Sequence, residues 1–409
     1  MIKLQMPTAD LLAAITVVQK SVGSRSPIPI LHDIKLENDG DGHLTLHATN
    51  LEMYASVTIG VDYNGTGESS EKAWILAVPA KTLADVVGTV ASEKVQLFVT
   101  NKGTALRVET PNSGATINAH NADDFPISPD IAAGAQIMMP VDILLQTIGR
   151  VAYAARKDES LPKLTGIETT IRDGVLRMAA TDGYRLSIAS TKVEDVDGGL
   201  TIIAPAKILL EFARVATNGV CENIHVLINE NRISFVFTDY TANLSNVMIS
   251  GSLIDARFPD YRAIIPKNKT TSITVSVTEM KQAVKAAKLM AKDNAGIVRL
   301  IIDVERNPRF NLDDTSSLES ETTGFGTLTV QAKSDEYGEI EQTIKIRCSG
   351  LSTIISFNVD YLTEMVTAIS SGEFTMELTE PTRPAKITGM GIGEDEHLQV
   401  MMPMHPTRA

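Results

Sequence analysis

Three lysines could bind phosphate groups together. Lys281, Lys285 and Lys288 follow one another at intervals of four and three residues. On an α-helix, where successive side chains are about 100° apart, this spacing places the three ammonium groups on one face, away from the apolar residues Met280 and Val284. A row of cations of this kind can bind phosphate oxygens without reading a base sequence. For a single helix, a solvated charged face is the simpler interpretation.

Cations recur at equivalent positions of other predicted helices. Lys20 and Arg150 lie near the ends of two helices that resemble the one carrying Lys281, and Lys81 and Lys207 take the same place in two copies of a second helix. The chain as a whole is acidic, with 37 lysines and arginines against 50 aspartates and glutamates. Its formal net charge is −13. A basic helical face that recurs in an acidic protein indicates that charge is segregated on the surface.

The sequence carries no recognisable catalytic or metal-binding motif. It has no GxSxG, HExxH or P-loop pattern, and its seven histidines are scattered. Cys221 and Cys348 stand alone and are interpreted as small buried hydrophobic residues. The segments 38–43 and 389–396 are interpreted as turns, because they depart from the calcium-loop and dinucleotide-binding patterns. We therefore expect a protein that is not an enzyme and that has no metal and no cofactor.

The helices that carry these residues recur with a period of about 130 residues. An apolar stripe of Leu11, Ile15 and Val18 returns at residues 144, 148 and 151 and again at 280, 284 and 287. A second helix returns as 79–87, 205–213 and 358–366. This second helix has an acidic residue at the same position in all copies: Asp85, Glu211 and Glu364.

Between the helices lie segments in which apolar and polar residues alternate, with Gly, Asn and Asp at the turns, as in antiparallel strands. The period is longer than that of solenoid repeats, so each copy is expected to have its own core. The sequence therefore predicts an α+β protein of three repeated domains, 1–131, 132–264 and 265–409. The acidic, Ser/Thr-rich segment 305–324 is predicted to be an exposed loop of the third domain.

No stretch of about 18 apolar residues is present, which predicts that no helix spans a membrane. The N-terminus has no basic region followed by an apolar run, and therefore no recognisable signal peptide. We expect a cytoplasmic protein.

In their order and spacing, eight motifs resemble the bacterial sliding clamp family, the beta subunit of DNA polymerase III. They are RSPIPILHDIKLE, LEMYAS, VPAKTL, KDESLPKLTGI, ATDGYRLS, FPDYRAIIP, FNVDYL and VMMPMHP. The resemblance implies the clamp fold, with two helices packed on antiparallel sheets in each domain. It also implies a closed ring made by a head-to-tail homodimer, which encircles duplex DNA and acts as a processivity factor.

The resemblance also assigns residues to DNA and to the dimer. Arg25, Lys81 and Lys207 are the best candidates for phosphate contacts, and the other helix cations Lys20, Arg150, Lys281, Lys285 and Lys288 join them. These contacts would be independent of DNA sequence. The dimer interface is expected at Ala115 and Ile117 in one domain and at Lys288 and Leu289 in another.

A hydrophobic pocket between the second and third domains is implied by the same resemblance. It would take a short peptide containing Gln and Leu or Phe from the replicative DNA polymerase subunit, the clamp loader and repair proteins. The matching residues are Leu164, Thr181, Gly183, Tyr184, Arg185, Leu186, Pro266, Asn358, Tyr361, Pro384, Val400, Met401, Met402, Pro403 and Met404. Flexible methionines would adapt to several apolar anchors, and Arg185 would fix polar groups. Because residues 401–409 are taken as a terminal edge segment, we expect their deletion to cost little of the fold.

The sequence departs from the family at three places. Tyr184 stands where many relatives have histidine, Leu161 stands where arginine is usual, and the chain continues beyond His405. An alternative function is a three-domain scaffold that binds partner peptides without encircling DNA. Topological retention on closed circular DNA would separate the two functions.

Overall fold

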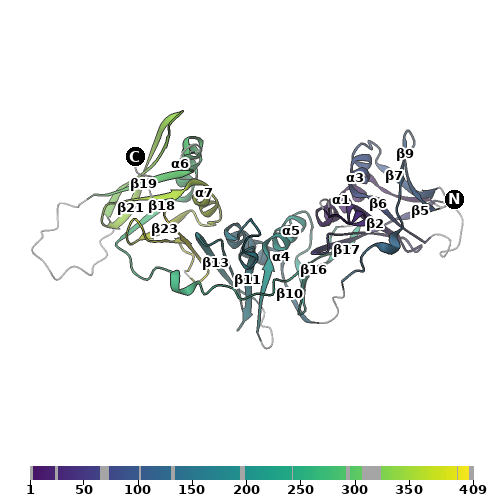
Figure 1. Cartoon of the computed structure of the whole chain (residues 1–409), viewed down its shortest axis with the longest axis horizontal. Helices are drawn as coiled ribbons and strands as arrows, with labels where there is room; N and C mark the ends of the chain where they lie inside the picture. Colours follow the sequence, from purple (N-terminus) through teal and green to yellow (C-terminus); the bar gives the residue numbers. More distant parts are fainter. Residues whose placement is uncertain are drawn as a thin grey trace, which may run out of the picture. The chain divides into compact units, whose positions relative to one another are not determined.

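The structure is a computed structural model of the chain, built from antiparallel sheets with helices packed on them (Figure 1). It describes residues 3–23, 26–64, 73–100, 103–129, 134–193, 199–241, 243–291, 295–305, 324–393 and 395–404. Every strand pairing established between the described strands is antiparallel, which confirms the predicted α+β class. Arg25 and nearly all of the predicted 305–324 loop lie outside the described residues, as do residues 405–409.

The helices form where the apolar stripes predict them. They are α1 (Thr8–Val18), α3 (Ala80–Gly88), α4 (Val141–Val151), α5 (Ala206–Ala216), α6 (Val277–Met290) and α7 (Val359–Thr367). Proline precedes α1, α3 and α5, whereas Ser276 caps α6 and Asn358 caps α7. The Asn358 side chain accepts hydrogen bonds from the backbone N–H groups of Asp360 (2.9 Å) and Tyr361 (3.1 Å), which satisfies donors that the first turn leaves free.

A five-stranded sheet belongs to the first repeat. Its strand order is β5 (Asp62–Asn64), β1 (Lys3–Pro7), β7 (Lys94–Thr100), β8 (Ala105–Glu109) and β9 (Gly114–Asn118). Strand β9 pairs with β8 along one side, and no described strand pairs with its other side. The backbone groups of that outer edge are therefore open to a further strand.

An eight-stranded sheet continues from the first repeat into the second. Its order is β10 (Ala135–Pro140), β15 (Asn223–Ile228), β16 (Arg232–Asp239), β17 (Leu244–Ser252), β4 (Met53–Gly60), β3 (His43–Thr49), β2 (Asp33–Asn38) and β6 (Trp74–Pro79). The pairing of β17 with β4 joins the two repeats, with Ile249 opposite Ala55. Helices α1 and α5 contact strands of this sheet. Segment 38–43 forms the turn between β2 and β3, as predicted.

A twelve-stranded sheet continues from the second repeat into the third. Its order is β14 (Leu200–Pro205), β11 (Gly166–Arg172), β12 (Val175–Thr181), β13 (Arg185–Lys192), β25 (His397–Met401), β24 (Ala385–Gly389), β23 (Glu373–Leu378), β18 (Thr271–Ser276), β21 (Gly338–Gly350), β20 (Gly324–Ser334), β19 (Ile297–Val304) and β22 (Thr353–Asn358). Strands β24 and β25 form a hairpin, as predicted for the turn at 389–396.

The last strand corrects one expectation. Strand β25 is not at an edge, because it pairs with β13 on one side and with β24 on the other. Met401 is 1% exposed and belongs to the core of the third repeat. Deleting residues 401–409 would remove this side chain and part of a central strand, so the prediction that the deletion costs little of the fold is wrong.

The chain divides into two compact units, although the sequence has three repeats. The first unit is Met1–Leu145 with Ala204–Asp255, and the second is Gln146–Ile203 with Ala256–Ala409. Each unit therefore contains one terminal repeat and part of the middle one. The division follows the two long sheets, because each of them crosses from one repeat into the next.

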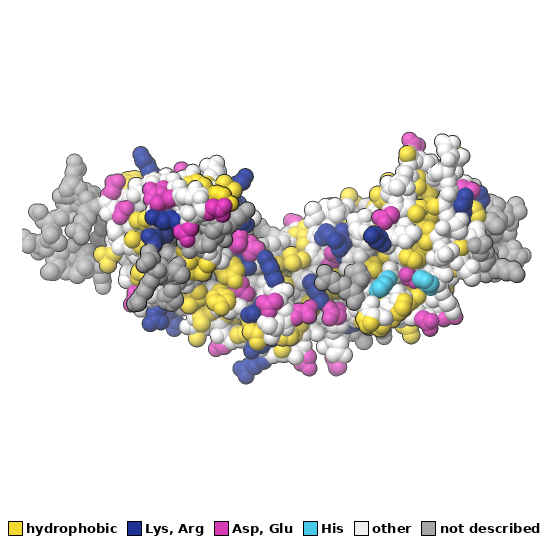
Figure 2. All heavy atoms as spheres, turned by 45° about the horizontal axis from the view of Figure 1, so that its top comes forward, with side chains coloured by type: hydrophobic (Ala, Val, Ile, Leu, Met, Phe, Trp, Pro, Cys, Tyr) yellow, Lys and Arg dark blue, Asp and Glu magenta, His cyan; other side chains and the backbone are white. Residues whose placement is uncertain are grey.

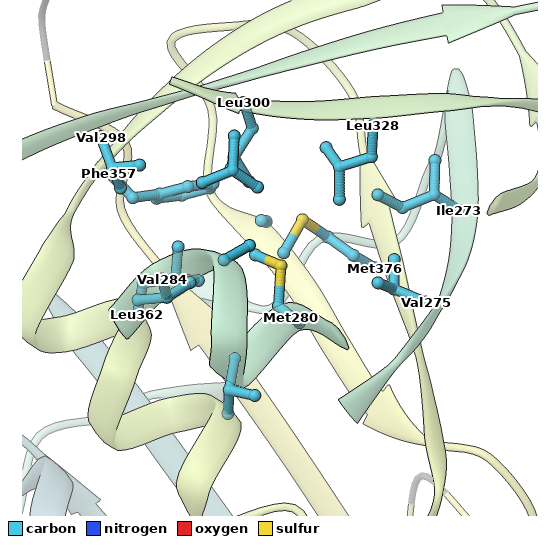
Figure 3. Packing of buried hydrophobic residues seen from close by; sticks show 14 of the residues in the cluster. Ile273, Val275, Met280, Val284, Val298, Leu300, Leu328, Phe357, Leu362 and Met376 are labelled. Atoms are coloured by element: carbon cyan, nitrogen blue, oxygen red, sulfur yellow. The ribbon is translucent and has the colours of Figure 1, made fainter. Parts of the chain in front are cut away.

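The core of the third repeat lies between two helices and a sheet. Met280 and Val284 of α6 and Leu362 of α7 point toward strand residues such as Leu300 and Phe357 (Figure 3). Each of these side chains is at most 1% exposed. Their burial stabilises the repeat through the hydrophobic effect, by roughly 1.5–3 kcal/mol for each large side chain.

The two cysteines differ in burial. Cys348 is buried as predicted, but Cys221 is only half-buried, because it lies in the segment between α5 and β15 instead of inside a sheet. The described residues contain no group of three or more metal-ligating side chains. Among the described residues, no helix is long and apolar enough to cross a membrane.

Candidate functional site

A cavity of about 700 Å³ lies in the second compact unit. Four segments line it: the turn between β12 and β13, the segment 263–268, the segment 379–384 and the end of β25. The predicted pocket residues in its lining are Thr181, Gly183, Tyr184, Arg185, Leu186, Pro266, Pro384, Val400 and Met402. The structure thus brings together side chains that are more than 200 residues apart in sequence.

The lining of this cavity does not include Leu164, Asn358, Tyr361, Met401, Pro403 or Met404. Leu164 and Met401 are buried, and Asn358 caps α7. Tyr361 lies next to the lining, because its ring centroid is 6.5 Å from that of Tyr184. The backbone N–H of Met404 donates to the carbonyl of Ser356 (2.8 Å), which holds this residue beside β22.

The sequence did not reveal half of the lining. The residues that it missed are Ala263, Ile264, Ile265, Lys267, Asn268, Thr379, Glu380, Thr382 and Arg383. They lie in two segments with no helical or strand periodicity. The prolines at positions 266, 381 and 384 were the available signal, because proline clusters mark loops and loops carry binding residues.

The turn between β12 and β13 is held by its own side chains. Thr181 Oγ1 donates to the carbonyl of Arg185 (2.6 Å) and accepts from the N–H of Gly183 (3.1 Å). Asp182 Oδ1 accepts from the N–H groups of Tyr184 (2.9 Å) and Arg185 (3.0 Å). Gly183 has φ +96°, a conformation that glycine adopts without strain. The turn is therefore closed in one shape, with Tyr184 61% exposed beside the cavity.

Arg185 is the buried centre of an ion-pair network. Its Nε lies 3.0 Å from Asp182 Oδ2, its Nη1 lies 2.6 Å from Glu364 Oε2, and its Nη2 donates to the carbonyl of Tyr153 (2.6 Å). The guanidinium is also 4.2 Å from the ring centroid of Tyr361. Only 3% of the side chain is exposed. The expected contact of Arg185 with polar groups of a peptide stays a prediction, since the guanidinium is committed to partners within the chain.

Glu364 links this network to the surface. Its second oxygen lies 2.8 Å from Lys157 Nζ. Burial alone would raise the pKa of Glu364, but hydrogen bonds and charge from Lys157 and Arg185 outweigh burial and lower it. The carboxylate is therefore held in its ionised form, which is the form that Arg185 needs as a partner.

A second buried polar cluster lies between β13, β25 and the end of α4. Ser187 Oγ donates to the carbonyl of Arg150 (2.7 Å), and Tyr153 OH donates to Gln399 Oε1 (2.6 Å). His397 and Gln399 are each 1% exposed. Burial, together with the charge of Arg150, lowers the pKa of His397 to about 4. The imidazole is therefore neutral at ordinary pH.

The predicted phosphate-binding cations differ in their surroundings. Lys20, Lys81, Lys281 and Lys285 are exposed and form no ion pair with any described residue. Lys207 forms an ion pair with Glu52, and Lys288 Nζ lies 2.7 Å from Asp360 Oδ1. On the face that Figure 2 shows, basic and acidic side chains are interspersed.

Arg150 is the least accessible of these cations. Its Nη2 donates to Ser370 Oγ (3.2 Å), and its Nε is buried with no hydrogen-bond partner in the described residues. Burial lowers its pKa. Arg150 thus contributes to the interior of the second unit as well as to its surface.

The predicted dimer-interface residues lie on an open edge and at a helix end. Ala115 and Ile117 belong to β9, where Ile117 is buried and Ala115 is half-buried. Leu289 is in the last turn of α6 and is 65% exposed. Its neighbour Lys288 is held by the ion pair with Asp360.

Three consecutive repeats of two helices on antiparallel sheets define the sliding-clamp class of fold. Models of the DNA polymerase III beta subunit match the chain in order: the N-terminal domain at residues 2–129, the central domain at 138–260 and the C-terminal domain at 318–405. The chain therefore belongs to the DNA polymerase III beta subunit family, the beta sliding clamps, and its function is that of a non-catalytic processivity factor.

Relatives and solved structures agree along the whole chain. The beta sliding clamp of Synechocystis sp. is 24% identical over 408 residues, which cover 95% of this chain and 96% of the relative. The DNA polymerase III beta subunit of Thermotoga maritima has a TM-score of 0.82 at 24% identity, with both chains covered completely. The sliding clamp of Bacillus subtilis has a TM-score of 0.84 at 22% identity and covers 99% of this chain.

Buried His397 should make stability depend on pH. In the unfolded chain a histidine binds its proton near pH 6.5, whereas folded His397 does so only near pH 4. The neutral imidazole of His397 therefore adds to the free energy of unfolding in full above about pH 6.5. This stabilisation is lost as the pH falls toward 4, by about 1.4 kcal/mol per pH unit. Urea unfolding of His397→Gln should show a smaller loss of stability on acidification than the parent. His225→Gln, at an exposed side chain of β15, should not.

Proposed function

We propose that two copies of this chain close head to tail into a ring around duplex DNA. Each copy would contribute three clamp domains, 1–131, 132–264 and 265–409. The observation that carries the proposal is the match of all three family domains in order along one chain. The open edge of β9 supports it, because an unpaired edge strand is a site at which a second chain can add. A heterologous contact used twice closes a ring.

Within the ring, we propose that cations of the helices contact DNA phosphates. Lys20, Lys81, Lys281 and Lys285 have the properties this requires, because they are exposed and their charges are not compensated by a described carboxylate. Lys207 and Lys288 would have to exchange a surface carboxylate for a phosphate. Surface ion pairs contribute only about 0–1 kcal/mol, so this exchange costs little. Contacts to phosphates alone permit sliding, since every position along the duplex is equivalent.

The cavity in the second unit is proposed to bind short peptides of the replicative polymerase subunit, the clamp loader and repair proteins. Its lining joins apolar side chains, among them Leu186, Pro266 and Met402, to polar ones such as Lys267 and Glu380. Met402 is 41% exposed and has the flexible side chain that suits several partners. Its backbone N–H donates to the carbonyl of Tyr184 (2.8 Å), which places it beside the turn.

Solution mass is the first test of the ring. One chain has a mass of 44.1 kDa, so a two-subunit ring should sediment at twice that value, about 88 kDa. Sedimentation equilibrium at micromolar concentration measures it. A species of one or three chains would exclude the proposed ring.

Charge reversal of two free cations tests the DNA contacts. In Lys20→Glu/Lys81→Glu, the salt slope of binding to duplex DNA should become shallower by about 1.8, because each phosphate contact contributes about 0.9. The loss of affinity for duplex DNA should be the same on every DNA sequence. The matched control is Lys192→Glu/Lys345→Glu, because both lysines are exposed and lie on strands β13 and β21 instead of helices. A loss confined to some sequences, or an equal loss in the control, would contradict the assignment.

A methionine substitution tests the pocket. Met402→Ala should weaken binding of a peptide that contains Gln and Leu or Phe by about tenfold, because part of the apolar contact is lost. Titration calorimetry measures the affinity. Met138→Ala changes an exposed methionine of β10, 52% exposed and outside the cavity, and should bind the peptide like the parent. If Met402→Ala also binds normally, the peptide occupies another site.

A further inference from the structure

Glu211 and Glu364 occupy equivalent positions in two repeats, and each takes part in a contact between neighbouring repeats. In α5, Glu211 Oε1 lies 2.6 Å from Nη2 of Arg214. The same Nη2 donates to the carbonyl of Thr16 (2.9 Å), in the last turn of α1. The carbonyls at a helix C-terminus have no partner within the helix and carry partial negative charge, so a guanidinium is a favourable cap. Glu211 therefore orients an arginine that ties the second repeat to the first.

Glu364 repeats this arrangement at the next joint. It occupies the same position in α7 that Glu211 has in α5, and its carboxylate lies 2.6 Å from Nη1 of Arg185. Arg185 Nη2 donates to the carbonyl of Tyr153 (2.6 Å), in the short 3-10 helix Ala152–Ala154 that follows α4. A carboxylate of the third repeat thus holds an arginine against the segment that follows the first helix of the second repeat.

The two joints differ in where the arginine comes from. Arg214 belongs to the same helix as Glu211, whereas Arg185 is the first residue of β13 and lines the cavity. Arg185 Nε binds Asp182, and Asp182 closes the turn that carries Tyr184. At the second joint, the contact that ties the repeats is also the contact that shapes the pocket.

Tyr361 extends the same connection. It lies one turn before Glu364 in α7, and its ring centroid is 4.2 Å from the guanidinium carbon of Arg185. The Tyr361 ring centroid is also 6.5 Å from that of Tyr184. A cation is attracted to the face of an aromatic ring, so the position of Arg185 influences where the Tyr361 ring lies.

We propose that Glu364 is a positioning residue of the peptide pocket, which acts through Arg185 on the 181–185 turn and on Tyr361. The proposal rests on the proposed peptide-binding function of the cavity. Glu364 itself is not part of the cavity lining. It acts by neutralising and orienting a guanidinium whose side chain is 3% exposed and which therefore depends on partners inside the protein. Without this carboxylate, Arg185 has to move toward water or toward Asp182, and the turn moves with it.

The experiment compares matched variants at the two joints. Glu364→Gln should lower the affinity for a peptide that contains Gln and Leu or Phe by roughly three- to thirtyfold, because the shape of the pocket changes. Titration calorimetry measures this affinity. Glu211→Gln removes the same charge at the same repeat position but away from the cavity, and should leave peptide affinity unchanged. Lys157→Ala removes the exposed partner of Glu364 and should change affinity less than twofold. Thermal unfolding of each variant separates a loss of stability from a loss of affinity.

A double-variant cycle tests the route through Arg185. In the Arg185→Gln background, Glu364→Gln should weaken peptide binding by less than a further twofold. The guanidinium through which Glu364 acts is already absent from that variant. Equal effects of Glu364→Gln in both backgrounds would overturn the proposal, as would a Glu364→Gln variant that binds like the parent. If the parent itself does not bind the peptide, the proposed function of the cavity fails instead.

Discussion

The pairing of β13 with β25 is the interaction on which the second unit depends. Arg185 lies opposite Met401 and Ser187 lies opposite Gln399, so the last described strand of the chain is inserted beside a strand of the second repeat. Side chains alternate between the two faces of a strand, and a slip of one residue would exchange Arg185 and Leu186 between them. Both the ion-pair network and the cavity therefore exist only in this register.

Polar groups inside the joint favour that register. Apolar side chains could pack in more than one alignment, whereas the hydrogen bond from Tyr153 to Gln399 and the bond from Ser187 to the Arg150 carbonyl form in one. The cost is visible in the same cluster, because Arg150 Nε, His397 Nδ1 and Gln399 Nε2 are buried with no hydrogen-bond partner in the described residues. Each such group costs about 1–3 kcal/mol. Part of the stability gained from the long sheet is thus given up for a defined alignment.

The sequence predicted what is local and missed what depends on distant partners. The stripe of Leu11, Ile15 and Val18 located α1, because helical periodicity is contained in neighbouring residues. The turn at Asp182 and Gly183 has an equally local signal, because Asp-Gly between two alternating segments is typical of a hairpin. The pairing of Arg185 with Glu364 could not be predicted from the sequence, because the two residues are 179 positions apart. Only the register of β13 and β25 brings them together. The pairing of Lys207 with Glu52 and the central position of β25 were hidden for the same reason. The segments 263–268 and 379–384 have no periodicity that could have placed them.

The charges of the helices suit a clamp that holds DNA without fixing it in place. Lys207 and Lys288 each have a carboxylate of their own chain within reach, Glu52 and Asp360, whereas Lys81 has none among the described residues. In the proposed ring, a phosphate that approaches Lys288 competes with Asp360, so the net gain from each contact is small. A small gain per contact keeps the barrier between neighbouring positions on the duplex low. Retention would then come from closure of the ring, and the cations would only centre the DNA.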